Sequence, residues 1–315
     1  MLTVFYAVIG AFSFFGHNGI KGVRAVITAI ISYVLCKAVL SFSYSTKTLD
    51  MPDFNRKLNT VPVPRLGGVG FFVAFFISLA LKWFFFGRAS LTEAALMITG
   101  GLTLLLGSAD DFFDLSPTVK LIFQIIISLI ASAILCYGEP PLCVIIKAFY
   151  ISLLINAFNF IDGLDGLCCG ISISALLFFS LSELLILNTG MGISTLLLVF
   201  SLVGFLPLNA YPARLYMGDA GSQTLGISIA IFSLAFWSEG LYITSAFMLI
   251  PIADVILTVI RRISAGKSPF KPDKAHLHHK LLDLGLTHPQ AVALLLAFSA
   301  FCSLLSLSAY LIFTA

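Results

Sequence analysis

The chain has 315 residues, of which 59% are hydrophobic and 10% are charged, and its mean hydropathy is +1.04. A soluble domain carries about 25% charged residues, so this composition excludes a soluble globular protein and indicates a polytopic membrane protein. The net charge of +3 is small and the 18 Lys and Arg residues occur in short clusters, so the chain lacks the continuous basic face that a nucleic-acid-binding protein needs.

Ten apolar runs are long enough to cross the hydrocarbon core of a bilayer as helices. A further apolar run, residues 2–16, either crosses the membrane or lies in its interface, so residues 1–24 add an eleventh helix at most. We therefore expect an all-α polytopic integral membrane protein with 10 to 11 transmembrane helices in a single domain, residues 1–315. The ten runs are 25–44, 67–87, 94–109, 120–138, 142–160, 167–187, 193–210, 223–239, 241–260 and 290–313.

The polar connections between these runs alternate with short connections that carry few polar residues. Each polar connection is therefore two membrane crossings from the next. All of them must then share one face of the membrane. This face holds 12 of the 18 basic residues and all eleven Asp residues, and by the positive-inside rule it is the cytoplasmic face. The four Glu residues fall at the opposite face and are interpreted as solvated residues of the outer turns. The polar connections are 45–66, 110–119, 161–166, 211–222 and 261–289.

The second polar connection carries two adjacent carboxylates, Asp110 and Asp111, and the next helix opens with Lys120. Adjacent carboxylates repel each other, so the pair needs a cation or a shared proton, and one member can acquire a pKa suited to proton transfer. Because carboxylates at the end of a membrane helix are costly, we expect both to be functional. Ser116 and Pro117 are instead typical of a helix N-cap and a first helical position.

The third polar connection follows an apolar helix that contains two amides. Asn156, Asn159, Asp162 and Asp165 recur every three residues, so any helical stretch aligns them in one row. The glycine after each of the two Asp residues lets backbone and ligand approach closely. An ordinary Asp-Gly turn does not need two Asn residues in the preceding helix, so the row predicts a binding site.

The fourth polar connection places Asp219 between two glycines, where its carboxylate is an unhindered ligand for a hard cation. Mg²⁺ typically takes one or two carboxylates and completes its coordination with water and substrate phosphate. Tyr216, three residues earlier, either offers an aromatic face to a base or belongs to the aromatic belt of the membrane interface.

The fifth polar connection begins with Arg261 and Arg262 and contains His276, His278 and His279. Basic donors opposite a group of carboxylates are what a metal-bound diphosphate requires. Zinc binding is an alternative role for the three histidines, but their spacing is not HExxH and no cysteine is near. The polar connections together predict phosphoryl transfer between a soluble nucleotide donor and a lipid.

These motifs resemble those of the polyprenyl-phosphate N-acetylhexosamine-1-phosphate transferases, which belong to glycosyltransferase family 4. The resemblance covers roughly residues 45–290 and rests on five motifs in the same order. They are PxPRLGG at 62–68, DDxxDLSPxxK at 110–120, NAFNFIDGLDGL at 156–167, NxxPAxxYMGDxGS at 209–222 and RRxxxGKSPFKPDKxHLHHxLLDLG at 261–285.

The resemblance implies that UDP-N-acetylhexosamine and polyprenyl phosphate react to polyprenyl-diphosphate-N-acetylhexosamine and UMP, with Mg²⁺, or alternatively Mn²⁺, as cofactor. It implies that Asp219 and Asn159 bind the metal ion. Asp110 or Asp111 then either deprotonates the lipid phosphate or forms a covalent phospho-aspartate. The residues matched to the nucleotide, diphosphate or sugar are Lys120, Asn156, Asp162, Asp165, Asn209, Tyr216, Arg261, Arg262, His276, His278 and His279.

The resemblance further implies a bacterial cytoplasmic membrane with the active site facing the cytoplasm, and it leaves a homodimer open. Two residues depart from the pattern: Asn59 stands where relatives usually have His, and Tyr216 replaces the commoner Phe. The last motif is similar to that of enzymes with simple UDP-N-acetylhexosamine donors, which favours N-acetylglucosamine as the sugar.

Two other functions compete with this interpretation. The pattern DDxxD at 110–114 is also the Mg²⁺-diphosphate motif of intramembrane prenyltransferases, although such an enzyme would leave the MGDAGS and HLHH segments unexplained. A transporter of lipid-linked sugars would need ionisable residues near the bilayer midplane, where only Lys37 is a plausible candidate.

Overall fold

The structure, a computed structural model, describes residues 19–51, 61–87, 89–187, 190–264, 266 and 276–314. The apolar run 2–16, Asn59 and the lysines 267, 271 and 274 lie outside these ranges. The described elements are, in chain order, α2 (Gly19–Thr46), β1 (Leu49–Asp50), β2 (Val63–Pro64), α3 (Gly67–Phe86), α4 (Leu91–Phe113), α5 (Pro117–Leu135), α6 (Pro141–Ile161), α7 (Leu167–Ser182), the π-helix η1 (Glu183–Leu187), α8 (Gly192–Asn209), α9 (Gly218–Leu234), α10 (Trp237–Phe247), α11 (Leu249–Ser264), α12 (Leu277–Asp283) and α13 (His288–Thr314).

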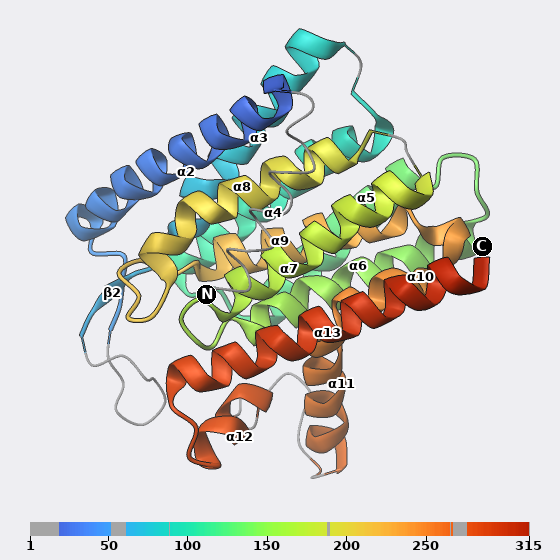
Figure 1. Cartoon of the computed structure of the whole chain (residues 1–315). Coiled ribbons are helices and arrows are strands. Elements are labelled where there is room, and N and C mark those ends of the chain that lie inside the picture. Colours follow the sequence, from blue (N-terminus) through green and yellow to red (C-terminus); the bar gives the residue numbers. More distant parts are fainter. Residues whose placement is uncertain are drawn as a thin grey trace.

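The long helices form a bundle in which α11 projects from one side, with α12 beside it (Figure 1). Within the described ranges, eight helical segments are long and apolar enough to cross a membrane, namely α2 to α8, with α7 continuing through η1, and α13. This confirms the expected all-α polytopic membrane fold. The expected run 223–239 corresponds to the 17-residue α9, and the expected run 241–260 is divided into α10 and α11 at Met248.

Helix α9 lies at the centre of the bundle, because every residue from Ala220 to Leu234 is buried. Glycines let neighbouring helices approach it closely. A Cβ at Gly107 of α4 would lie 2.6 Å from Ala220 Cα, and a Cβ at Gly226 of α9 would lie 2.6 Å from Ile155 Cα of α6. These distances leave no room for a side chain, so the sequence fixes where α4 and α6 cross α9.

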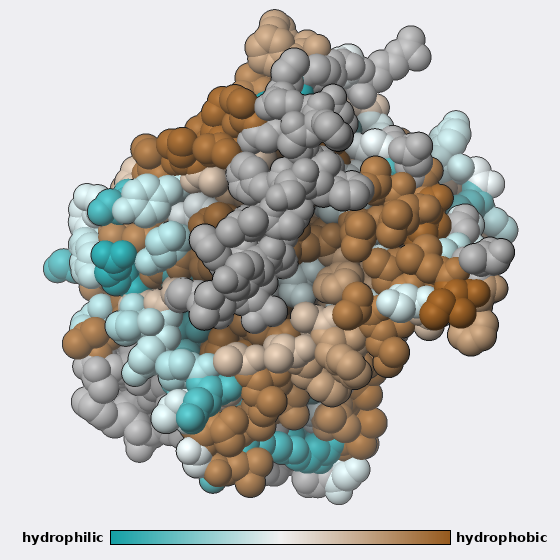
Figure 2. All heavy atoms as spheres, viewed as in Figure 1, coloured by the Kyte–Doolittle hydropathy of each residue, from teal (hydrophilic) through white to brown (hydrophobic). Residues whose placement is uncertain are grey.

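The outer surface of the bundle is apolar along its length. Large side chains such as Phe84, Leu105 and Ile312 are 69% to 82% exposed. Brown apolar spheres cover the long sides in Figure 2, whereas hydrophilic spheres gather mainly at the end that carries β2 and around α11 and α12. A surface of this kind suits lipid tails along the sides and water at the polar end.

The glutamates at the opposite end correct one expectation, because two of the three described ones are not solvated. Glu93 is 2% exposed; it forms an ion pair with Lys82, accepts a hydrogen bond from Ser194 and completes a capping box with Ser90. Glu183 accepts the backbone N–H groups of residues 190 and 191. Burial is tolerated because each carboxylate is hydrogen-bonded.

Candidate active site

The five polar connections meet at one end of the bundle, as their alternation along the chain predicts. They surround a polar cavity of about 420 Å³. The cavity wall contains seven aspartates, together with Arg65, Asn159, Asn209, Tyr216, two histidines and backbone of the third and fourth connections. The aspartates are Asp50, Asp110, Asp111, Asp114, Asp162, Asp165 and Asp219.

The ammonium group of Lys120 contacts carboxylates from two different connections. Its Nζ donates to Asp110 Oδ2 at 2.7 Å and also forms an ion pair with Asp219 Oδ2. The other oxygen of Asp110 accepts the backbone N–H of Leu115 at 2.8 Å. The positive charge reduces the repulsion that would otherwise separate Asp110 from Asp219, so Lys120 is part of the acidic cluster.

The neighbouring carboxylate of Asp111 lies at the N-terminus of α9. Its two oxygens accept the backbone N–H groups of Asp219 and Ala220, each at 3.0 Å. The first N–H groups of a helix have no partner within the helix, and the helix dipole favours a negative charge there. Asp111 therefore fixes the start of α9 and, with it, the position of Asp219 beside Asp110.

The helix start predicted for the same connection is confirmed: Ser116 caps α5 and Pro117 is its first residue. Asp114 is the C-cap of α4 in the left-handed region, with φ of 48°. Its side chain accepts a hydrogen bond from Arg65 at 3.1 Å, so it joins the first and second polar connections.

The row of amides and carboxylates in the third connection is divided by the structure. Asn159 faces the cavity and accepts a hydrogen bond from Ser222 at 3.0 Å. Asn156 is not in the cavity wall, since its amide donates to Gln124 and to the carbonyl of Ser152. Of the row, the structure thus brings Asn159 and the two aspartates to the cavity.

The two aspartates that follow α6 line the cavity in different settings. Burial, together with the negative charges of Asp219 and Asp165, raises the pKa of Asp162 to about 8. Asp165 Oδ2 accepts the backbone N–H of Ala213 at 2.9 Å. A site so crowded with carboxylates favours a bound cation, because a cation relieves their mutual repulsion.

The fourth connection holds its aromatic and amide residues through backbone contacts. Tyr216 donates its N–H to the carbonyl of Pro64 at 2.8 Å, and it forms a parallel bridge with Arg65 next to β2. Asn209 is 3% exposed and donates to the carbonyl of Leu215 at 3.2 Å. Both residues line the cavity.

Of the basic residues predicted in the fifth connection, only His279 lies in the cavity wall. Arg262 is 4% exposed, and its guanidinium lies 5.6 Å from the ring centre of Phe160, whose edge meets His276. Neither Arg262 nor Arg261 lines the cavity in the described structure. The basic character of this segment in the sequence did not reveal that Arg262 is buried against Phe160.

The segment of histidines is held by Asp254 of α11. Its Oδ2 accepts a hydrogen bond from His276 Nδ1 at 2.8 Å, and its Oδ1 accepts the backbone N–H of Leu277 at 2.7 Å. His278 is buried and stacks parallel to His276, with 5.7 Å between the ring centres. Asp254 therefore orients His276 and fixes the start of α12.

Reasoning from the sequence missed several cavity residues, among them Arg65 and His288. Arg65 was part of a recognised motif without a role, and His288 was outside every motif. His288 opens α13, where its Nε2 accepts the backbone N–H of Asp165 at 3.1 Å and its ring stacks on Tyr211 at 4.6 Å. A lone histidine at a helix start carries no spacing signal, so only the three-dimensional fold reveals it.

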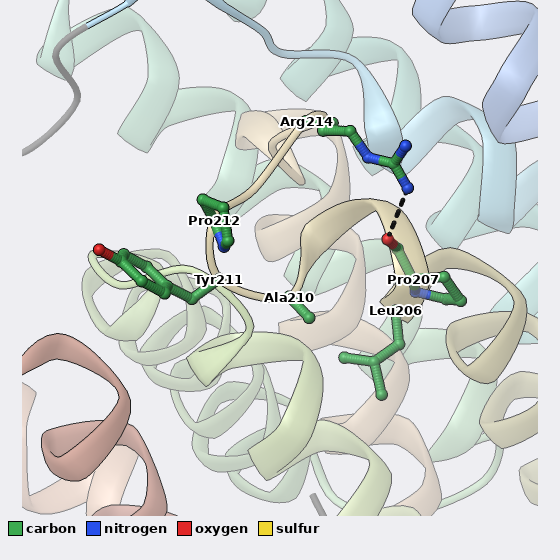
Figure 3. A pocket seen from close by; sticks show the side chains of 6 residues that line it. All are labelled: Leu206, Pro207, Ala210, Tyr211, Pro212 and Arg214. Carbon is green, nitrogen blue, oxygen red and sulfur yellow. Dashed lines mark hydrogen bonds between the residues drawn. The ribbon is translucent and has the colours of Figure 1, made fainter.

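Next to the polar cavity lies an apolar pocket between α7, α8 and α13. A second pocket lies at the C-terminal end of α8 and is drawn in Figure 3. In Figure 3 Tyr211 and Arg214 point in different directions, and Arg214 donates to the carbonyl of Pro207 at 3.3 Å. Arg214 does not line the polar cavity.

A hard divalent cation such as Mg²⁺ fits the oxygen donors of the cavity better than a softer metal ion does. Within the described residues, no three His, Cys, Asp or Glu side chains form a ready-made metal site. Carboxylate and amide oxygens of Asp110, Asp219 and Asn159 surround the same space. Such a set matches Mg²⁺, which needs few protein ligands when a substrate phosphate supplies the others.

The fold and cavity define a polytopic membrane protein with an acidic phosphoryl-transfer type of site at one end of its helix bundle. The model of glycosyl transferase family 4 matches residues 93–237. An undecaprenyl-phosphate α-N-acetylglucosaminyl 1-phosphate transferase of Thermotoga maritima is 32% identical, with 89% of this chain and 88% of the relative covered. The chain belongs to glycosyl transferase family 4.

Two other relatives carry similar names. A probable undecaprenyl-phosphate N-acetylglucosaminyl 1-phosphate transferase of Bacillus subtilis is 30% identical over 86% of this chain and 80% of its own length. The undecaprenyl-phosphate α-N-acetylglucosaminyl 1-phosphate transferase of Escherichia coli K12 is 26% identical over 78% and 72%. These findings confirm the resemblance drawn from the motifs and favour it over prenyl transfer and transport.

Proposed function

We propose that the protein transfers N-acetylglucosamine-1-phosphate from UDP-N-acetylglucosamine to a polyprenyl phosphate and releases UMP. The observation that carries this proposal is the cavity in which Asp110, Asp111, Asn159, Asp162 and Asp219 meet at the polar end of an apolar bundle. A soluble nucleotide can enter such a cavity from water, and a lipid phosphate can enter from the membrane. The names of the relatives support both substrates.

The donor nucleotide is placed at the third and fourth connections. Tyr216 offers an aromatic face to the uracil, and stacking on an aromatic ring is a common way to hold a base. Asp162, Asp165 and Asn209 provide carboxylate and amide groups for the ribose and base. The fifth connection contributes His279 and His288 to the cavity wall, and we assign His279 to the diphosphate or the sugar of the donor.

Members of this family generally depend on a divalent metal ion, and we assign Mg²⁺ to Asp219 with Asn159 as a second ligand. When bound, the ion supplies charge neutralisation for the diphosphate of the donor. Lys120 holds Asp219 and Asp110 together, so its ammonium group keeps the carboxylates in position and adds positive charge near the reacting phosphates.

In the reaction, an oxygen of the lipid phosphate attacks the sugar-linked phosphorus of the donor. A new P–O bond forms between the lipid phosphate and the sugar-linked phosphorus, and the bond from this phosphorus to the bridging oxygen breaks. The bridging oxygen leaves as part of UMP. One diphosphate replaces another, so the reaction is close to reversible and catalysis rests on positioning and charge neutralisation. Asp110 or Asp111 accepts the proton of the lipid phosphate, because both carboxylates line the cavity.

We assign the site to the cytoplasmic face of the bacterial inner membrane, because the polar connections of the sequence carry 12 of the 18 basic residues. UDP-sugars are cytoplasmic substrates under this proposal, and the lipid acceptor reaches the site along the apolar flank. The product would be the lipid-linked first sugar of a cell-envelope polysaccharide.

The proposal is tested with purified protein in detergent, undecaprenyl phosphate, Mg²⁺ and a radiolabelled donor. UDP-N-acetylglucosamine should deliver label to the organic phase, and added UMP should reverse the transfer. UDP-N-acetylgalactosamine and UDP-MurNAc-pentapeptide are the alternative donors. Absence of organic-phase label from all three donors, with no effect of EDTA, would exclude the proposed reaction.

A matched pair of variants tests the metal site. Asp219→Ala should abolish Mg²⁺-dependent transfer, whereas Asp283→Ala removes an exposed carboxylate of α12 outside the cavity and should keep wild-type activity. Full Mg²⁺-dependent turnover in Asp219→Ala would remove this residue from the site. A loss in both variants would indicate a general effect on folding.

A further inference from the structure

The acidic cavity contains an arginine, Arg65, from the PxPRLGG motif at 62–68. Within the described part of the chain, Arg65 is the one Lys or Arg side chain in the cavity wall, opposite seven aspartates. We propose that the guanidinium group of Arg65 binds the diphosphate of the nucleotide donor. This inference rests on the proposed function, because it takes a nucleoside diphosphate sugar as the donor.

The backbone places Arg65 directly beside Tyr216. The two residues form a parallel bridge, the N–H of Tyr216 donates to Pro64 O at 2.8 Å, and the N–H of Gly67 donates to Tyr216 O at 2.9 Å. These bonds hold the two residues next to each other. If Tyr216 stacks on the base, the adjacent arginine is within the short span that separates a base from its own phosphates.

The side chain of Arg65 retains the means to bind a phosphate. Its guanidinium contacts Asp114 Oδ1 at 3.1 Å and Asp50 Oδ1 at 3.9 Å, and the side chain is 26% exposed. Nε is buried and has no hydrogen-bond partner among the described residues. Because a guanidinium group has five N–H donors, these two contacts leave others for a ligand, and arginine binds phosphate through two parallel hydrogen bonds.

The charge balance of the cavity gives the same assignment. A diphosphate adds negative charge to a space that already contains seven carboxylates, so it needs cationic partners. Lys120 already forms ion pairs with Asp110 and Asp219, and Arg262 is buried against Phe160. Among the described residues of the cavity wall, Arg65 therefore supplies the permanent positive charge at the nucleotide side, in addition to the metal ion.

The competing explanation is that Arg65 merely joins two connections through its ion pair with Asp114. Arg65→Gln and Asp114→Asn both break this pair, but only Arg65→Gln removes the cation. A structural role predicts that both variants lose thermal stability and that neither loses affinity for the diphosphate. A binding role predicts that the two variants differ.

Binding of UDP and of uridine, measured by calorimetry with Mg²⁺ present, separates these explanations. We expect Arg65→Gln to bind UDP roughly 10- to 100-fold more weakly, as for a lost hydrogen bond to a charged group, and to bind uridine as the wild type does. Asp114→Asn should bind UDP at least as tightly as the wild type. Arg214→Gln is the matched control, since Arg214 bonds to Pro207 O outside the cavity.

A second measurement uses the wild-type protein and so does not depend on the folding of a variant. Phenylglyoxal modifies accessible arginines, and mass spectrometry locates the product. UDP should protect Arg65 and uridine should not, while Arg214 reacts equally in both samples. The proposal is overturned if UDP gives no protection, or if Arg65→Gln loses uridine affinity as strongly as UDP affinity.

Kinetics then distinguish the donor from the acceptor phosphate. The KM for the UDP-sugar should rise in Arg65→Gln while the KM for polyprenyl phosphate stays constant, and the reverse pattern would assign Arg65 to the acceptor and overturn the proposal. The two proposals can fail separately. If the protein binds UDP through Arg65 but transfers no sugar phosphate, the proposed function is refuted and the diphosphate site remains.

Discussion

Gly218 leaves the space that the carboxylate of Asp111 occupies at the start of α9. A Cβ at position 218 would lie 2.6 Å from Asp111 Oδ2, and Gly218 has a φ of +72°. The contact joins two motifs that are 107 residues apart in sequence. It places the backbone N–H groups of α9 on Asp111 and the side chain of Asp219 beside Asp110.

Gly218→Ala should therefore disrupt both the backbone and this contact. A left-handed conformation costs a residue with a Cβ about 1 to 2 kcal/mol, and the displaced carboxylate adds to that cost. We expect a loss of about 2 kcal/mol or more in stability and a large loss of activity. Thermal unfolding in detergent and sugar-phosphate transfer are the measurements.

The matched control for this substitution is Gly101→Ala in α4. Gly101 is helical, and a Cβ there would meet no atom within 4 Å. Alanine is the better helix former by about 1 kcal/mol, so the control should be as stable as the wild type or slightly more so. Equal behaviour of the two variants would contradict the steric argument at Gly218.

Glu93→Ala should destabilise the protein without changing the chemistry of the folded molecules. The substitution leaves Lys82, Trp83 and Ser194 without their shared carboxylate at the end of the bundle opposite the cavity. Loss of one partner from a buried ion pair costs about 3 kcal/mol or more. Chemical unfolding measures the stability, and activity is normalised to the folded fraction.

Glu93→Gln keeps the size of the side chain and one carbonyl oxygen that can accept hydrogen bonds. It should lie between the wild type and Glu93→Ala in stability. If Glu93→Ala is as stable as the wild type, the carboxylate of Glu93 is solvated, as its position in the sequence suggests, and the prediction is wrong.

Sequence reasoning located the cavity but not all of its contacts. The alternation of polar connections placed five of them at one end, and the pairing of Asp110 with Lys120 follows from their closeness in the chain. The contact of Asp111 with the start of α9 spans 108 residues. No periodicity encodes such a contact, because it depends on how α4 packs against α9.

Charge was also an incomplete guide to the basic residues of the site. Arg261 and Arg262 end an amphipathic helix, and the sequence cannot tell that Arg262 packs on Phe160 while Arg65 reaches the cavity. Likewise, the four glutamates are polar residues beside short loops, a pattern typical of solvated turns. The burial of Glu93 became visible only with its partners Lys82 on α3 and Ser194 on α8.

The stability of the protein should fall in mild acid partly because of His278. Burial, followed by the nearby charges of His279 and His276, lowers the pKa of His278 to about 3, whereas Asp254 opposes the shift and His288 adds to it. In the unfolded chain the pKa is about 6.5. The folded state therefore keeps His278 neutral, and the unfolded state gains a proton as the pH falls below about 6.5.

The contribution of His278 is complete above pH 6.5 and decreases as the pH falls from 6.5 toward 3, by at most about 1.4 kcal/mol per pH unit. His278→Phe keeps a ring against Gly163 but cannot titrate. Between pH 7 and pH 5 its stability should fall by about 1 to 2 kcal/mol less than that of the wild type. Parallel pH profiles of unfolding for both proteins would contradict the assignment.

His288 should position the nucleotide side of the cavity through Asp165. Its Nε2 accepts the backbone N–H of Asp165, and its ring stacks on Tyr211. His288→Phe keeps a ring for the stack but removes the acceptor, so the KM for the UDP-sugar should rise roughly 5- to 12-fold, the effect of one lost hydrogen bond. The kcat should change little, because His288 does not contact Asp110 or Lys120.

His288→Gln supplies the missing acceptor, since its side-chain carbonyl can take the same backbone N–H, and it should restore most of the donor affinity. Tyr211→Leu removes the stack alone and tests whether the ring contact matters separately. Steady-state kinetics with varied UDP-sugar measure all three variants. A fall in kcat at constant KM, or equal effects of Phe and Gln at position 288, would show that the bond to Asp165 does not set donor binding.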